Sequence, residues 1–212
     1  MDRTTTTVSA VRSVGPDAVA IDLETPTGFD AAPGQFVKFW LPSVAEEPRF
    51  YTVSSPTVTD TFEITVEIDH DGALGPHIAD LTAGDKVAIS GPFGSAYYGG
   101  EERVVVLAGG PGVGPAIAIA ERTLEEGGEA AVVYRDDEPI HEERLDGLSD
   151  RGAFVRIIGN DDAVAEATRD ALTGDPDEGM FVYGFADFLD VATDAIEAAG
   201  GNTDRAHLEN FG

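Results

Sequence analysis

One stretch decides the fold of this chain: Arg103-Val104-Val105-Val106-Leu107-Ala108-Gly109-Gly110-Pro111-Gly112-Val113-Gly114-Pro115. Its first part is a continuous apolar run, which is typical of a strand that is buried on both faces. Its second part is a glycine-rich loop that leads into helix-prone sequence. After it, stretches typical of helices (114–126, 142–149, 162–172 and 187–199) alternate with apolar runs (130–134, 154–158, 180–183 and 205–208). This alternation predicts a parallel, doubly wound α/β sheet, with Asp161 capping the helix over 162–172.

The sequence before this stretch has a different period. Residues 5–14 and 18–24 alternate between apolar and polar positions, and a Gly15-Pro16-Asp17 turn separates them. Similar short runs follow at 35–41, 61–68 and 85–90. They predict an antiparallel barrel or sandwich. We therefore expect two domains, 1–99 and 100–212, with the boundary at Tyr98-Gly99-Gly100-Glu101.

Composition excludes several classes of function. The 212 residues are 42% hydrophobic, which suffices for a core without cross-links. The chain has no cysteine, so disulfides, thiolate metal sites and cysteine-held iron–sulfur clusters are excluded within it, and we expect no metal site. It also has no signal-peptide pattern and no apolar run of about 18 residues, which predicts a soluble, cytoplasmic protein.

Charge gives a second constraint. The net charge is −27, and the only lysines are Lys38 and Lys86. Such a surface repels phosphate backbones and anionic lipids, so nucleic-acid and membrane-surface binding are not expected. It resembles the acidic, lysine-poor surfaces of proteins from salt-accumulating halophiles, in which molar salt screens the self-repulsion. A merely acidic protein is the alternative.

Two segments combine residue types that suit an anionic, planar cofactor. The first is Arg49-Phe50-Tyr51-Thr52-Val53-Ser54-Ser55-Pro56. On a strand, Arg49 and Tyr51 point the same way, and we expect Phe50 to point into the core. Arg49 could bind a phosphate and Tyr51 could stack on a ring. The second segment is the loop 109–114, whose glycines let the backbone approach a pyrophosphate at a helix N-terminus.

Four motifs in order resemble the ferredoxin-NADP reductase superfamily of flavin and nicotinamide reductases. They are Arg49-Phe50-Tyr51-Thr52, Gly91-Pro92-Phe93-Gly94, the loop 109–115 and Glu209-Asn210-Phe211. The resemblance implies a flavin-binding β-barrel followed by a nicotinamide-binding α/β domain. By the same resemblance, Arg49 contacts the flavin diphosphate, Tyr51 packs on the isoalloxazine and Thr52 sits by N5.

The resemblance also implies a full set of site residues. Its catalytic members are Thr52, Glu209 near the hydride path, and Phe211, which covers the ring. The cofactor-binding members are Arg49, Phe50, Tyr51, Thr52, Val53, Ser54, Gly72, Leu74, Gly75, Pro76, His77, Gly109, Gly110, Pro111, Gly112, Val113, Gly114, Pro115, Arg135, Asp136, Tyr183, Gly184 and Phe211.

Several positions depart from the family pattern. A serine that often contacts the flavin pyrophosphate is Gly75 here, a loop threonine is Pro111, and a Cys-Gly-Pro segment is Tyr183-Gly184-Phe185. His70 and His77 are read as surface or phosphate-contacting imidazoles rather than acid–base groups. The nicotinamide donor depends on the turn after 130–134, where Arg135 favours NADPH while Asp136 or Asp137 favours NADH. The sequence leans to NADH.

The resemblance implies an NAD(P)H-dependent flavoprotein reductase. It would pass a hydride from NADH or NADPH to FAD, with FMN as the other possible flavin, and electrons on to a separate acceptor such as an iron–sulfur ferredoxin. One alternative is a flavin-binding electron-transfer subunit that does not itself oxidise NAD(P)H, which Pro111 and Tyr183-Gly184-Phe185 favour. The other is a cofactor-free binding or scaffold protein.

Overall fold

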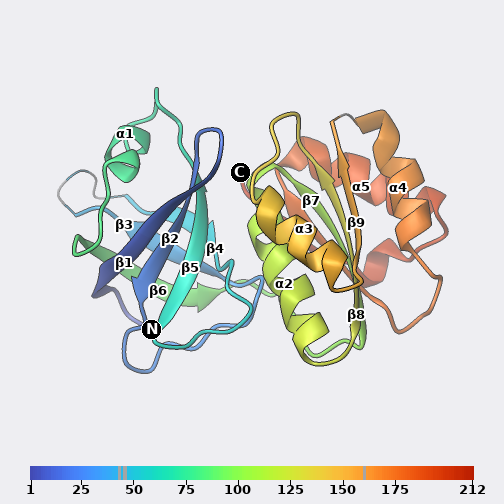
Figure 1. The fold of residues 1–212 in the computed structure, drawn as a ribbon, viewed down its shortest axis with the longest axis horizontal. Coiled ribbons are helices and arrows are strands. Elements are labelled where there is room, and N and C mark those ends of the chain that lie inside the picture. Colours follow the sequence, from blue (N-terminus) through green and yellow to red (C-terminus); the bar gives the residue numbers. More distant parts are fainter. Residues whose placement is uncertain (43, 45–46, 160) are drawn as a thin grey trace.

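The chain forms two β-sheets that lie side by side along its long axis, as Figure 1 shows. The structure is a computed structural model, and it describes residues 1–42, 44, 47–159 and 161–212. The first sheet uses the sequence up to residue 93, and the second begins at residue 103. Each sheet packs against a hydrophobic core on its own side of the molecule, and the space between the two sheets is where a site can form.

The first sheet is antiparallel and closes into a barrel. Its strand order is β4-β3-β6-β1-β2-β5. An isolated bridge between Val53, just after β4, and Ile64 of β5 joins the two outer strands. This bridge brings the two ends of the sheet together, as in a small barrel. The elements are β1 (Thr4–Gly15), β2 (Ala18–Glu24), β3 (Phe36–Trp40), β4 (Arg49–Thr52), β5 (Thr61–Glu67), α1 (Gly75–Ala79) and β6 (Lys86–Phe93).

The second sheet is parallel, in the order β11-β10-β7-β8-β9. Its strands are β7 (Arg103–Gly109), β8 (Glu129–Arg135), β9 (Phe154–Ile158), β10 (Gly179–Gly184) and β11 (His207–Asn210). Its helices are α2 (Val113–Glu125), α3 (Glu142–Asp150), α4 (Val164–Ala171) and α5 (Ala186–Ala198). The predicted combination of an antiparallel barrel and a doubly wound parallel sheet is confirmed.

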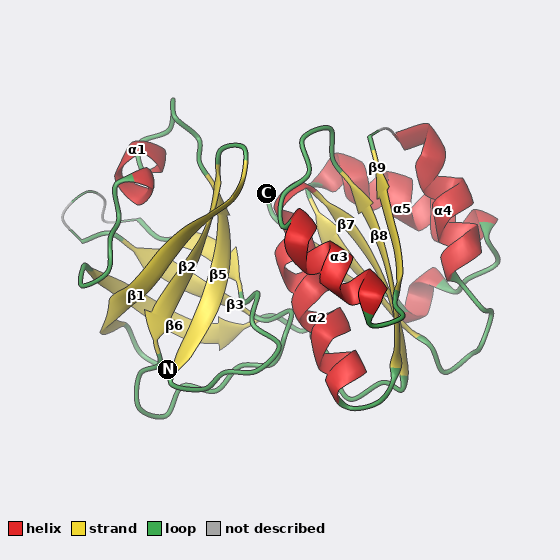
Figure 2. Cartoon of the chain, in the orientation of Figure 1, coloured by secondary structure: helices red, strands yellow, loops and turns green. Residues whose placement is uncertain are grey.

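Helices cover both faces of the parallel sheet, as Figure 2 shows. Alternate residues of β7 divide between the two faces: Val104 and Val106 pack with α2 and α3, while Val105 and Leu107 pack with α4 and α5. Burial on both faces explains why this strand is apolar throughout. A separate cluster fills the barrel.

Two local predictions were wrong. Asp161 does not cap α4, because it lies in a 3₁₀ turn (Asp161–Ala163) and its carboxylate accepts from Arg135 Nε at 2.7 Å. The residue at the N-cap of α4 is Ala163, which makes no side-chain cap. The last strand begins at His207 rather than Arg205, which belongs to a preceding 3₁₀ turn. Among the described residues, no helix is both long and apolar enough to cross a membrane.

Candidate functional site

A cavity of about 380 Å³ lies between the barrel and the parallel sheet. This volume is within the usual range for ligand pockets. The chain's C-terminus also lies between the two halves (Figure 1). The cavity is lined by Arg49, Phe50, Tyr51, Thr52, Thr65, Glu67, Ile68, Asp69, Pro111, Pro115, Phe185 and Phe211. The first motif, the glycine-rich loop and the C-terminal motif therefore meet at one place, although they lie far apart in sequence.

Strand β4 supplies one wall, with a phase opposite to the predicted one. Val53 is fully buried in the barrel core, and Tyr51 packs against that core beside Phe39. Alternation then turns Phe50, Thr52 and Ser54 outward, toward the second sheet. The prediction that Phe50 points into the core was wrong: its residue is 57% exposed and its ring meets Phe36 edge-on at 5.8 Å.

The other side chains of β4 differ in exposure and in the polar contacts that they already make. Arg49 is exposed and pairs with no carboxylate in the described part of the chain; its nearest polar contact is the Pro48 carbonyl at 3.4 Å. Burial raises the pKa of Tyr51 to about 12, against a smaller opposing effect of Arg49, so the phenol is neutral. Thr52 is buried and lines the cavity. The wall thus presents a guanidinium that pairs with none of the described carboxylates, a neutral ring and a hydroxyl.

The glycine-rich loop forms the facing wall. After β7 it makes a 3₁₀ turn (Gly110–Gly112), and α2 follows at Val113. Pro111 and Pro115 line the cavity. A Cβ on Gly112 would lie 2.2 Å from the Tyr183 carbonyl oxygen, so no side chain fits there. Glycine is required at this position by close packing of the loop on β10.

The C-terminus closes the site. The Phe211 N–H donates to the Gly184 carbonyl at 3.0 Å, and its ring meets Phe185 edge-on at 6.1 Å. A second cavity, of about 260 Å³, shares Phe50, Thr52 and Phe211 with the first. Glu209 lines only this second cavity, and burial raises the pKa of its carboxyl group.

Several predicted residues lie elsewhere. Val53 is buried in the barrel core, and Ser54 is buried beside Gly114 of α2. Tyr183 is buried and donates to the Ala96 carbonyl at 2.6 Å, and Val113 is in the second core. The segment Gly72, Leu74, Gly75, Pro76 and His77 lies at α1; Leu74 packs in the barrel core and His77 is exposed. Only Ile68 and Asp69, just before this segment, reach the cavity.

The turn after β8 is acidic and its arginine is already engaged. Arg135 Nε donates to Asp161 at 2.7 Å. Asp136 accepts from the Tyr134 hydroxyl at 2.8 Å and from the Glu138 N–H at 2.9 Å. Burial, with a further effect of Asp136, raises the pKa of Glu67, whose Oε1 would lie 3.5 Å from a Cβ on Gly110. Two carboxylates therefore flank the glycine-rich loop.

Sequence reasoning missed the contribution of β5. Thr65, Glu67 and the following Asp69 line the cavity, yet the strand was read only as a period-two element. The sequence does contain a pattern that marks this face of the strand. In Phe62-Glu63-Ile64-Thr65-Val66-Glu67 every second residue is polar, and these polar residues point away from the barrel core. The sequence could not tell whether that outward face meets water or the second sheet.

Comparison with known proteins agrees with this arrangement. Residues 5–98 match the family model of the oxidoreductase FAD-binding domain. The ferredoxin reductase component of 3-ketosteroid-9-alpha-monooxygenase from Mycolicibacterium smegmatis is 28% identical over 92% of this chain and 62% of that protein. A probable dihydroorotate dehydrogenase B (NAD(+)) electron transfer subunit from Methanopyrus kandleri is 37% identical over 42% of this chain and 32% of that one. This chain thus spans under two thirds of either relative.

Solved structures share the fold over the whole chain. The ferredoxin reductase of carbazole 1,9a-dioxygenase has a TM-score of 0.85 at 19% identity, covering 100% of this chain and 70% of that one. A ferredoxin NADP+ reductase from Neisseria gonorrhoeae with bound FAD and NADP has a TM-score of 0.80 at 16% identity, covering 100% of both chains. These likenesses show the fold over the whole chain, and residues 5–98 in addition match the oxidoreductase FAD-binding domain.

Proposed function

We propose that this chain is an NADH-dependent flavoprotein reductase that binds FAD between its two halves and passes electrons to a separate acceptor. The observation that carries the proposal is the cavity itself, where the Arg49–Thr52 strand faces the glycine-rich loop across a space that Phe211 borders. Residues 1–99 would be the flavin domain and 100–212 the nicotinamide domain. The acceptor would carry any iron–sulfur cluster, because this chain has no cysteine.

The residues of the cavity fit a flavin. Arg49, which pairs with no carboxylate among the described residues, offers its guanidinium to a diphosphate, and Tyr51, Phe50 and Phe211 offer ring surfaces to a planar heterocycle. Glu67 and Asp69 would repel phosphate but can accept hydrogen bonds from sugar hydroxyls. Bound FAD supplies the redox chemistry, because its ring can take a hydride from a reduced nicotinamide and release the electrons to another carrier.

The chain's own residues would orient and shield the reactants. Thr52, which borders both cavities, would hold the polar edge of the flavin ring through its hydroxyl and backbone. Phe211 and Phe185 would exclude water from the ring face on the side of the parallel sheet. Glu209 lines only the second cavity, beside the same threonine, where its carboxyl group would meet the nicotinamide or a solvent proton.

NADH is the proposed donor because of the turn after β8. The single arginine there is paired with Asp161, while Asp136 retains lone pairs that can accept from a ribose 2′-hydroxyl. A 2′-phosphate would meet Asp136 and Glu67, and like-charge juxtaposition costs several kcal/mol. We expect kcat/KM for NADH to exceed that for NADPH by about a hundredfold on this basis.

The primary test is an anaerobic visible spectrum of FAD-loaded protein in molar potassium chloride, recorded before and after addition of NADH or NADPH. Bleaching with NADH supports the proposal, and Asp136→Asn should then improve kcat/KM for NADPH by about tenfold, equivalent to about 1.4 kcal/mol. Asp146→Asn makes the same charge change on the exposed face of α3 and should not alter kcat/KM for NADPH. Bleaching with NADPH alone would refute the choice of donor. Flavin released by denaturing the protein as purified, before any FAD is added, distinguishes FAD from FMN.

A second candidate function is supported by the same loop. Pro111 lacks an N–H and Glu67 lies close to Gly110, so both weaken a pyrophosphate site. The chain would then be an electron-transfer subunit that binds flavin but takes electrons from another protein. Flavin that stays oxidised with both nucleotides would favour this function, and a protein that binds no flavin would leave only a scaffold role.

The acidic surface is proposed to be an adaptation to a salt-rich interior. A net charge of −27 on 212 residues opposes compaction unless salt screens it. The adaptation to salt is independent of the reductase proposal and can be tested separately, through the dependence of stability on salt.

A further inference from the structure

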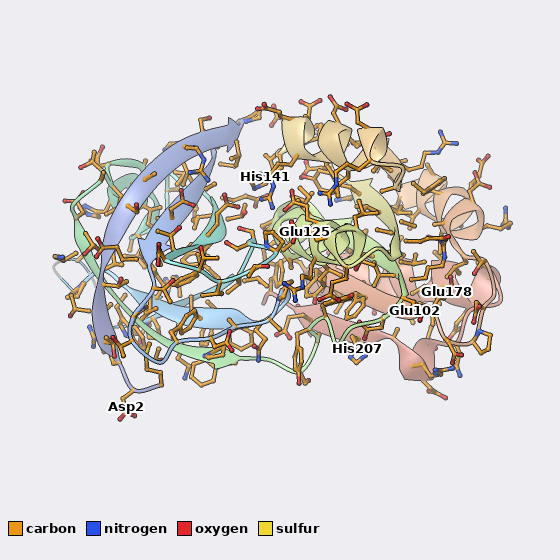
Figure 3. All side chains as sticks on the ribbon, turned by 60° about the horizontal axis from the view of Figure 1, so that its bottom comes forward. Asp2, Glu102, Glu125, His141, Glu178 and His207 are labelled. Atoms are coloured by element: carbon orange, nitrogen blue, oxygen red, sulfur yellow. The ribbon has the colours of Figure 1, made fainter. Side chains whose placement is uncertain are left out.

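A polar cluster crosses the seam between the two halves, and none of the roles proposed above uses it. Four of its six members are buried, and Glu121 and Arg144 are half-buried. Figure 3 shows His141, at the start of α3, facing the barrel across this seam. We name the cluster the seam clamp. Its members are Ser54, Glu63 and Thr65 from the barrel and Glu121, His141 and Arg144 from the parallel-sheet half.

Arg144 joins the halves directly. Its Nε and Nη2 donate to the two carboxylate oxygens of Glu121 on α2, at 3.0 and 2.6 Å. Its Nη1 donates to Glu63 Oε1 at 2.8 Å and its Nη2 to the Ser54 carbonyl at 2.9 Å, both on the barrel. A planar guanidinium that binds groups on both sides fixes direction as well as distance.

His141 adds a directional chain of hydrogen bonds. Ser54 Oγ donates to Glu63 Oε1 at 2.8 Å, so Thr65 Oγ1 must donate to Ser54 Oγ at 3.0 Å. Thr65 can then only accept from His141 Nε2 at 2.8 Å, which places the proton of a neutral imidazole on Nε2. The His141 backbone has φ 58°, and its N–H donates to the Val14 carbonyl at 2.6 Å. The histidine is therefore held from both ends.

The clamp is connected to both walls of the cavity. Ser54 lies two residues after Thr52, and Thr65 itself lines the cavity. On the other wall, a Cβ on Gly114 would lie 2.8 Å from Thr65 Oγ1 and 3.2 Å from Ser54 Cβ. The first turn of α2, which continues from the glycine-rich loop, is thus seated on the same two hydroxyl residues that Arg144 and His141 hold.

We propose that the seam clamp sets the separation between Thr52 and the glycine-rich loop, which makes Arg144 and His141 positioning residues for the transfer between two bound rings. This inference rests on the proposed function. A purely stabilising seam would not need this arrangement, because a buried ion-pair cluster is seldom more stable than apolar packing of the same volume. Hydrogen bonds of fixed direction do hold the two halves in one relative position. This matters because the rate of transfer between two bound rings falls steeply when they are misplaced by about 1 Å.

The test compares Arg144→Lys with Arg103→Lys. Arg103 is a matched control, because it also donates to two carboxylates and a carbonyl, on Glu178, Glu129 and Ala171, all within the parallel-sheet half. In both variants lysine keeps the positive charge but lacks the planar set of N–H donors by which the guanidinium binds several groups at once. We expect Arg144→Lys to slow flavin reduction by NADH in stopped flow about tenfold or more, with the dissociation constants of FAD and NADH changed less than about threefold. Arg103→Lys should leave the reduction rate near the wild-type value.

A second measurement does not depend on turnover. In the flavin-free protein, Arg144→Lys should raise amide hydrogen exchange at both 49–54 and 109–114, whereas Arg103→Lys should not. His141→Leu should behave like Arg144→Lys, and His141→Gln, which keeps a donor near the Nε2 position, should restore the rate. Equal reduction rates and equal exchange in Arg144→Lys and Arg103→Lys would overturn the clamp while leaving the reductase proposal intact. Wild-type flavin that neither nucleotide reduces would overturn both.

Discussion

Acidification should destabilise this protein through His141. The residue is 4% exposed, and burial, with the nearby Arg144 and Arg12 charges, lowers its pKa from 6.5 to about 3. In the unfolded chain the imidazole takes up a proton as the pH falls through about 6.5, but in the folded protein it stays neutral. The unfolded state therefore binds more protons below neutrality, and the free energy of unfolding must fall with pH.

The magnitude follows from these two pKa values. At pH 7.5 the histidine is neutral in both states and contributes almost nothing. At pH 5.5 about ten in eleven unfolded chains carry the proton while the folded protein does not, which lowers the free energy of unfolding by about 1.4 kcal/mol. Glu67 and Glu209 have raised pKa values and act in the opposite sense, gaining stability as the pH falls. Only a comparison between variants isolates the histidine.

The assay is urea unfolding of wild type and His141→Gln at pH 7.5 and 5.5, in the same molar concentration of potassium chloride. We expect the wild type to lose about 1.4 kcal/mol more than the variant over this interval, because glutamine cannot titrate. The other ionisable groups are common to both proteins and cancel in the difference. Equal losses in the two proteins would refute the claim that the fold holds His141 as a buried neutral donor.

Three further outcomes follow from packing and charge. Phe50→Ala should cost no more than about 1 kcal/mol in urea unfolding, rather than the roughly 3–5 kcal/mol of a buried phenylalanine, while weakening flavin binding. Gly112→Ala should destabilise by about 1–3 kcal/mol because its Cβ meets the Tyr183 carbonyl, whereas Gly147→Ala, in open space on α3, should stabilise by up to about 1 kcal/mol. Raising potassium chloride from about 0.1 to 2 M should increase the unfolding free energy, because the Debye length falls below about 3 Å and screens the charge of −27; unchanged stability would contradict the salt adaptation.

Periodicity predicted most of the fold because the strands of each sheet have a hydrophobic pattern that can be recognised within a few residues. The apolar run of β7 and the alternation of β5 came out close to their observed bounds, since buried and half-buried strands differ in pattern rather than in distant contacts. Arg49, Pro111 and Phe211, which belong to three of the motifs, line one cavity, while their roles in binding stay a prediction. The boundaries that failed, at Asp161 and Arg205, are short 3₁₀ turns, which carry no strong period.

The phase of the segment 49–54 could not be predicted because both faces of its last residues, Thr52 to Ser54, are covered, whereas Arg49 and Phe50 at its start are exposed. Val53 packs inside the barrel, and Thr52 and Ser54 are buried from outside by the second sheet, so apolarity does not distinguish the faces. The role of His141 was missed for a related reason. Its side-chain partner Thr65 lies 76 residues earlier in the chain. The outward, polar position of Thr65 looks identical to a solvent-facing one.

The polar character of this seam explains how one chain can hold two sheets firmly and still keep a cavity between them. An apolar seam would let the barrel core and the core around α2 merge, and close packing would then fill the space that a planar ligand needs. Ser54, Glu63 and Thr65 instead meet their partners through bonds of fixed length and direction, so the halves stop at a set distance. Thr65 belongs to both the clamp and the site, because it accepts from His141 and also lines the cavity.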